Sequence, residues 1–137
     1  MVTRNEMVSA EVANEPYCYL TTTGRSSGRP HEVEMWFAVD RQTLYLLAGG
    51  RDRADWVRNI RHDPAVRVRI GGVTYTGHGR SVEETSTEGR ARELLSAKYY
   101  GWQSGPLPNA WAREALPIAI DIEGVTAQSN PSLPSAR

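Results

Sequence analysis

Apolar and polar residues alternate along much of the chain, and a period of two predicts β-strands. From Val33 to Val39 every second residue is apolar, as in a strand with one buried face. The run Leu44–Gly49 is continuously apolar, which is typical of a strand covered on both faces. Glycine or proline bounds most of these runs. We expect six strands, at 17–23, 33–39, 44–49, 65–70, 73–82 and 116–124.

Two segments change from a period of two to helical spacing. The first, 52–62, predicts a helix with Asp52 as its N-cap. In the second, Thr85 and Glu88 fit a capping box that opens a helix through about Tyr100. Strands joined mostly by short turns, with two or three flanking helices, favour a mainly β (α+β) antiparallel barrel over a doubly wound sheet.

Glycines indicate where the predicted strands turn or bend. Gly71-Gly72 predicts a hairpin turn, and Gly77 and Gly79 predict a bulge or bend within a strand.

A chain of 137 residues is expected to form one domain. We expect a short helical segment at 1–15, the barrel at 16–124 and a disordered tail at 125–137, where proline and serine are frequent.

Overall charge and cysteine content narrow the class of function. The formal net charge is zero, so a general attraction to nucleic acid or to an anionic membrane is not expected. The single cysteine, Cys18, cannot form an internal disulfide, which fits a reducing cytoplasm. No apolar run approaches the ~20 residues of a membrane-spanning helix. The three histidines lack the spacing of metal ligands, and no metal is expected.

Positive charge is concentrated locally. The chain has fifteen arginines and one lysine, and 51–69 holds six arginines against three aspartates. Because an arginine fork binds phosphate and carboxylate in a bidentate manner, this zone is a candidate for binding a small anion.

The loop GRSSGR, from Gly24 to Arg29, is the first candidate anion site. Its glycines permit unusual backbone angles, and successive free amides in such a turn can form an anion nest. The alternative is a solvated turn whose arginines face water. The second candidate is Gly49-Gly50-Arg51, where exposed amides at a helix start attract anions. There the alternative is that the arginines pair with Asp52 and Asp55.

Two motifs in this order resemble the deazaflavin (coenzyme F-420)-dependent nitroreductase family. They are T-T-x-G-R-x-S-G-x-P near the first loop and W-x-x-N-[IL]-x-x-[DN]-P-x-V from Trp56 to Val66. The resemblance covers about 19–122. It implies the pyridoxamine 5'-phosphate oxidase-like split β-barrel, here six-stranded. It also implies hydride transfer from the reduced cofactor to a small organic acceptor, which would be an activated C=C bond, a quinone or a nitro compound.

The same resemblance implies roles for individual residues. The cofactor-binding set is Arg25, Ser26, Ser27, Gly28, Arg29, Pro30, His31, Trp36, Ala48, Gly49, Gly50, Arg51, Asp55 and Trp56. Trp36, Tyr99 and Trp102 are expected to face the substrate. By the chemistry of their side chains, Tyr99 and Tyr100 are the candidate catalytic residues, to donate a proton or orient a carbonyl, and the alternative is that they form only the pocket wall.

The sequence leaves the cofactor, the function and the oligomeric state open. FMN is the second possible cofactor, since Ser26 and His31 stand where the family commonly has basic residues and FMN has a single phosphate to hold. The chain could also be a non-enzymatic cofactor carrier or a nucleic-acid-binding barrel. The oligomeric state is either monomer or homodimer.

Overall fold

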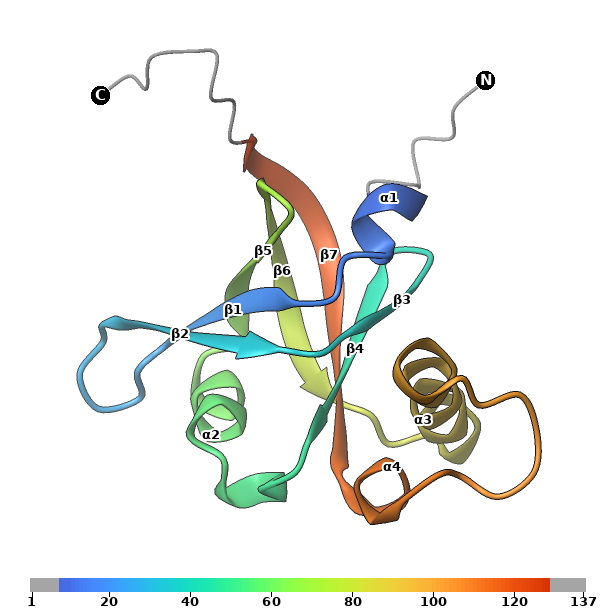
Figure 1. The fold of residues 1–137 in the computed structure, drawn as a ribbon. Helices are drawn as coiled ribbons and strands as arrows, with labels where there is room; N and C mark the ends of the chain where they lie inside the picture. Colours follow the sequence, from blue (N-terminus) through green and yellow to red (C-terminus); the bar gives the residue numbers. More distant parts are fainter. Residues whose placement is uncertain (1–7, 129–137) are drawn as a thin grey trace.

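A computed structural model describes residues 8–128, and its core is one antiparallel sheet of seven strands (Figure 1). The order across the sheet is β2-β1-β5-β6-β7-β4-β3. The strands are β1 (Cys18–Thr23), β2 (Pro30–Met35), β3 (Ala38–Asp40), β4 (Thr43–Ala48), β5 (Ala65–Ile70), β6 (Val73–Ser81) and β7 (Leu116–Gln128). The mainly β, antiparallel class is confirmed.

The strand count is seven and not six because the predicted strand 33–39 breaks at Trp36 and Phe37. The main-chain N–H of Phe37 donates to the Tyr99 hydroxyl at 3.0 Å, a side-chain acceptor in place of a strand partner. The two halves, β2 and β3, lie at opposite ends of the strand order. The chain therefore links both edges of the sheet, and the sheet curls around its interior.

The interior is filled by apolar side chains from nearly every strand. In β5 the burial alternates strictly, so Val66, Val68 and Ile70 face inward and the arginines between them face solvent. The largest fully buried residues of this core include Leu20, Phe37, Leu44, Leu46, Val68, Ile70, Tyr75, Ile118 and Ile120.

Helices cover the two ends of the curled sheet. They are α1 (Ala10–Ala13), the 3-10 turn η1 (Arg51–Arg53), α2 (Asp55–His62), α3 (Thr85–Tyr100) and α4 (Ala110–Glu114). The helix α2 packs against β1 and β6, whereas α3 packs against β3, β4, β7 and α4. Figure 1 shows α2 on one side of the barrel and the pair α3 and α4 on the other. No helix in 8–128 is both long and apolar enough to span a membrane.

Both predicted helix caps are wrong. The cap of α2 is Ala54, because Asp52 lies in the preceding 3-10 turn. The cap of α3 is Glu84, and Thr85 is already helical. Glu88 does not reach back to a cap amide, because its carboxylate pairs with Arg92 one turn later, at 2.7 Å.

The predicted ends of the chain also need correction. The expected helix at 1–15 is only the single turn α1, as far as the structure describes it, and residues 1–7 lie outside the described range. Strand β7 runs on through 125–128, which was expected to be tail, while 129–137 lie outside the described residues. The helix α4 was missed entirely.

The glycine predictions agree with the structure. Gly71 and Gly72 have φ values of 56° and 87°, as a tight hairpin turn between β5 and β6 requires. The pairing of β6 with β7 shifts register between Thr76 and Gly77, which is the expected bulge. Gly79 is needed for a different reason: a Cβ there would lie 2.8 Å from Cγ2 of Ile60 on α2.

The contact at Gly79 leads to a stability prediction. Gly79→Ala should lower the free energy of unfolding by about 1–3 kcal/mol, because the added methyl forces α2 away from β6. Gly89→Ala is the matched control: it lies inside α3 with no atom near a built Cβ, and it should raise stability by about 0.5–1 kcal/mol. Urea denaturation measures both changes. Equal effects of the two substitutions would contradict the close approach of α2.

Candidate functional site

The GRSSGR loop is a compact turn between β1 and β2 whose main chain is mostly bonded to the protein itself. Gly24 N–H donates to the Arg29 carbonyl, and Gly28 N–H donates to the Gly24 carbonyl, both at 2.8 Å. Gly28 has a φ of 71°, which explains why glycine stands there. The Arg25 and Arg29 amides also have side-chain acceptors. The predicted nest of free amides is therefore wrong for these four positions.

Arg25 is held in place by helix α2. Its Nη1 donates to Oδ1 of Asn59 at 2.8 Å and to the Asp55 carbonyl at 3.4 Å, and its Nη2 donates to Oδ1 of Asp55 at 3.0 Å. Arginine carries five N–H donors. Two of them, Nε–H and one Nη2–H, have no protein acceptor among the described residues. Arg25 is oriented by the fold and still has donors for a ligand.

Asn59 connects this arginine to the sheet. It is 4 % exposed, its Oδ1 also accepts the Arg25 main-chain N–H at 3.2 Å, and its Nδ2 donates to the Thr22 hydroxyl at 3.1 Å. Thr22 is itself buried at the end of β1. Both polar atoms of the Asn59 side chain are thus bonded, which locks the loop against α2. Asn59 was not among the predicted site residues, although it is the asparagine of the W-x-x-N motif that begins at Trp56 and could have been found from it.

A cleft of about 460 Å³ opens where the loop faces α2, and we call it the corner cleft. Its polar end is made by Arg25 and the serines, and its apolar side by Val33 and Trp56. The lining residues are Thr22, Gly24, Arg25, Ser26, Ser27, His31, Glu32, Val33, Asp55, Trp56 and Asn59. Six of the residues predicted to bind the cofactor meet here: Arg25, Ser26, Ser27, His31, Asp55 and Trp56.

A second cleft of about 370 Å³ is apolar and shares Val33 with the first. We call it the aromatic cleft. Trp36 meets Trp111 edge-on, with ring centroids 5.6 Å apart and planes at 90°, and it meets Tyr100 at 5.8 Å and 68°. The remaining lining residues are Glu34, Met35 and Leu47. Trp36 and Tyr100 were predicted at the site, whereas Trp111 was missed because its helix α4 lies in a stretch that reads as loop.

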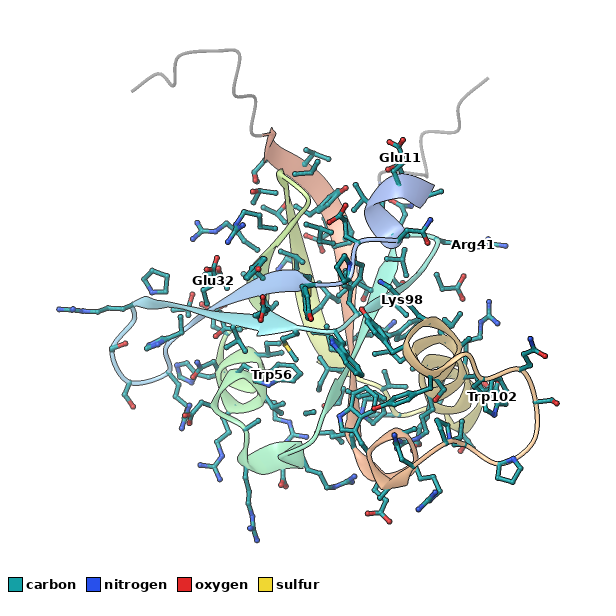
Figure 2. All side chains as sticks on the ribbon, in the orientation of Figure 1. Glu11, Glu32, Arg41, Trp56, Lys98 and Trp102 are labelled. Atoms are coloured by element: carbon teal, nitrogen blue, oxygen red, sulfur yellow. The ribbon has the colours of Figure 1, made fainter. Side chains whose placement is uncertain are left out.

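Tyr99 and Trp102 are placed differently from the prediction. Neither is among the residues that line the two clefts. The Tyr99 hydroxyl lies 2.9 Å from the Pro16 carbonyl and 3.1 Å from the Phe37 carbonyl, and burial raises the pKa of this phenol to about 12. The Trp102 indole N–H donates to the carbonyls of Gly105 and Pro106. Figure 2 shows Trp102 beyond α3, on the side of the molecule away from Trp56.

The second predicted loop, Ala48–Arg51, lies apart from the corner cleft. Ala48 is buried in the core and Gly50 is exposed. Gly49 and Arg51 line a smaller hollow of about 230 Å³ beside α4. Arg51 adopts a φ of 54°, and its Nη1 donates to the carbonyl of Glu114 at the end of α4. This arginine therefore ties the loop to the helix that carries Trp111.

Three residues of the first loop also lie outside the corner cleft. Gly28 and Pro30 line a separate hollow on the opposite side of β1 and β2, with a volume of about 470 Å³. Arg29 is exposed and is not among the corner-cleft residues.

Residues 1–121 of this chain match the family described as F420H(2)-dependent quinone reductase. The chain belongs to this family. The expected membership is thereby confirmed, and the protein is a deazaflavin-dependent oxidoreductase that reduces a small organic acceptor. Its cofactor is coenzyme F-420. No curated protein of known function is similar enough in sequence to be matched.

Solved structures share the fold at low sequence identity. The conserved hypothetical protein Rv2991 from Mycobacterium tuberculosis aligns with a TM-score of 0.74 at 20% identity, over 100% of this chain and 96% of that one. A structure described as F420 Reductase aligns at 0.60 and 21% identity, over 92% and 98%. An F420-H2 Dependent Reductase, FDR-A, aligns at 0.60 and 22% identity, over 79% and 94%.

The only lysine of the sequence, Lys98, leads to a pH prediction. Burial lowers the pKa of this ammonium from 10.5 to about 8. Between these two pKa values the unfolded chain still holds a proton that the folded chain has released. The free energy of unfolding therefore rises with pH over this interval. The difference in unfolding free energy between wild type and Lys98→Met should therefore grow in favour of wild type from about pH 8 to pH 10.5. Denaturant titrations at several pH values measure it, and a flat difference would contradict the lowered pKa.

Proposed function

We propose that the corner cleft binds the anionic end of the reduced deazaflavin and that Arg25 is the main cationic contact. The observation that carries this proposal is the arrangement of Arg25. Its guanidinium is oriented by the buried Asn59, and two of its N–H donors have no acceptor in 8–128. A group held this way loses little further freedom when it binds an anion.

The residues fit a ligand with an anionic end and a planar ring. Around Arg25, the hydroxyls of Ser26 and Ser27 and the ring of His31 supply further polar contacts. Trp56 and Val33 continue the wall as apolar surface, and Val33 leads into the aromatic cleft. Polar contacts at one end of the corner cleft and the apolar wall of Trp56 and Val33 at the other match the two halves of such a cofactor.

When bound, the cofactor supplies the hydride, and the chain supplies binding and orientation. Arg25 and the serines would hold the anionic end and so set how far the ring reaches. Trp36, Trp111 and Tyr100 would hold a planar acceptor and exclude water from it. We propose a quinone-type acceptor, because the matched family is described as a quinone reductase.

The acceptor also needs a proton, and the two candidate tyrosines differ in their ability to give one. The Tyr99 hydroxyl is occupied by main-chain groups, and its raised pKa makes it a weak acid. Tyr100 is 46% exposed and lines the aromatic cleft, so of the two it is the one that can reach an acceptor.

The cytoplasmic location and the choice between monomer and homodimer stay predictions.

The proposal predicts a specific loss of cofactor affinity. Arg25→Ala should weaken binding of the reduced deazaflavin about tenfold or more, the value of a lost charge-assisted hydrogen bond of about 1.5–3 kcal/mol. Fluorescence titration measures the dissociation constant, and adding FMN as competitor tests the second possible cofactor. Arg61→Ala is the control, since Arg61 is an exposed arginine on α2 outside the cleft lining.

Asp55→Asn separates the two partners of Arg25. Because the Asp55 side chain is 83% exposed, its ion pair contributes little to stability. Removing its negative charge should leave cofactor affinity equal or higher, while Asn59→Leu should lower it. Equal affinities for wild type, Arg25→Ala and Asn59→Leu would show that the anionic end binds elsewhere.

A further inference from the structure

The last turn of α3 holds two distant main-chain segments together. Lys98 Nζ donates to the Ala13 carbonyl at 2.9 Å and to the Phe37 carbonyl at 3.0 Å, and it lies 3.6 Å from the centroid of the Phe37 ring. The neighbouring Tyr99 hydroxyl contacts the Pro16 carbonyl and both main-chain groups of Phe37. The segment before β1 and the break between β2 and β3 are therefore fixed to the same helix end.

These contacts determine the path of the chain at Phe37. Both the N–H and the carbonyl of this residue are bonded to α3 side chains, and the ladder between strands resumes at Ala38. Without these partners, a buried N–H and carbonyl would each be left unpaired, at a cost of about 1–3 kcal/mol. The break in the strand, and with it the direction of the preceding Trp36, depends on Lys98 and Tyr99.

Tyr99 also contacts Trp36 directly. The two rings are stacked, with centroids 4.2 Å apart and planes within 1° of parallel. One face of the Trp36 indole is thus covered by Tyr99, while its edges meet Trp111 and Tyr100 in the aromatic cleft. Tyr99 itself stays outside that lining.

We propose that Tyr99, supported by Lys98, is a positioning residue for the reaction: it sets the orientation of Trp36 and so the alignment of the acceptor in the aromatic cleft. This inference rests on the proposed function. It gives Tyr99 a role through Trp36 and not through proton donation, because the hydroxyl is bonded away from the cleft. The anionic end of the cofactor, held at Arg25, lies outside its influence.

Tyr99→Phe is the test variant, because it keeps the aromatic ring and removes the hydroxyl that holds Phe37. Lys98→Met removes the second support and provides an independent variant if Tyr99→Phe does not fold. Tyr75→Phe is the matched control: it removes a phenol hydroxyl from β6, and Tyr75 lines neither cleft and makes no ring contact with Trp36 among the described residues. Thermal melting confirms that each variant is folded before it is used.

The first measurement needs no cofactor. Near-UV circular dichroism is recorded for each protein with and without the additional change Trp36→Phe, so that the difference isolates the signal of Trp36. We expect this signal to shrink in Tyr99→Phe and in Lys98→Met and to persist in Tyr75→Phe. An unchanged Trp36 signal in both folded test variants would overturn the inference, whatever the protein binds.

The second measurement uses the deazaflavin and a quinone acceptor. In both test variants kcat/KM for the acceptor should fall about tenfold or more, as a small misplacement of reacting groups can cause. The cofactor dissociation constant should stay at the wild-type value, in contrast to Arg25→Ala. A fall in cofactor affinity equal to the fall in turnover would overturn the positioning role. Failure of the wild type itself to bind the deazaflavin would instead refute the proposed function, and the Trp36 signal would then decide whether Tyr99 and Lys98 orient Trp36.

Discussion

The fold depends on one continuous stretch of chain that forms both edge strands of the sheet. β2 and β3 follow each other in sequence but lie at opposite ends of the strand order, and only Trp36 and Phe37 separate them. Phe37 is fully buried, and its main-chain groups are satisfied by side chains of α3. A buried main-chain group needs a partner, so this break could not exist without that helix end. The curl of the sheet and the position of Trp36 in the aromatic cleft follow from it.

Strand β2 shows the consequence for the site. It pairs only with β1, and its side chains are largely exposed. His31, Glu32 and Val33 line the corner cleft, while Pro30 lies in the hollow on the opposite side. An uncovered edge strand is normally a liability for a sheet. Here it provides the one wall that the corner cleft and the aromatic cleft have in common.

The polar end of the site illustrates how different contacts contribute. The pair between Arg25 and Asp55 is partly exposed, and such pairs are worth only about 0–1 kcal/mol. Asn59 is buried, and its Oδ1 and Nδ2 are both hydrogen-bonded, so its geometry is far more strongly determined. The orientation of Arg25 thus comes mainly from an amide on α2, and the aspartate adds a contact that a ligand anion can replace. Local loop chemistry alone does not explain the site.

The sequence by itself determined the features that depend on neighbouring residues. Strict alternation located β5, and a continuously apolar run located β4. Glycines located the hairpin and the bulge, and two short motifs identified the family and the loop that carries Arg25. Tertiary structure decided whatever depends on residues far apart in the chain. The strand break at Phe37 requires Tyr99, sixty-two positions later, and the aromatic cleft requires Trp111 from a one-turn helix. Tyr99 could not be told from a proton donor by its sequence position, because only packing shows that its hydroxyl is bonded to the main chain. Periodicity reports which face of an element is buried, but not which distant group it meets there.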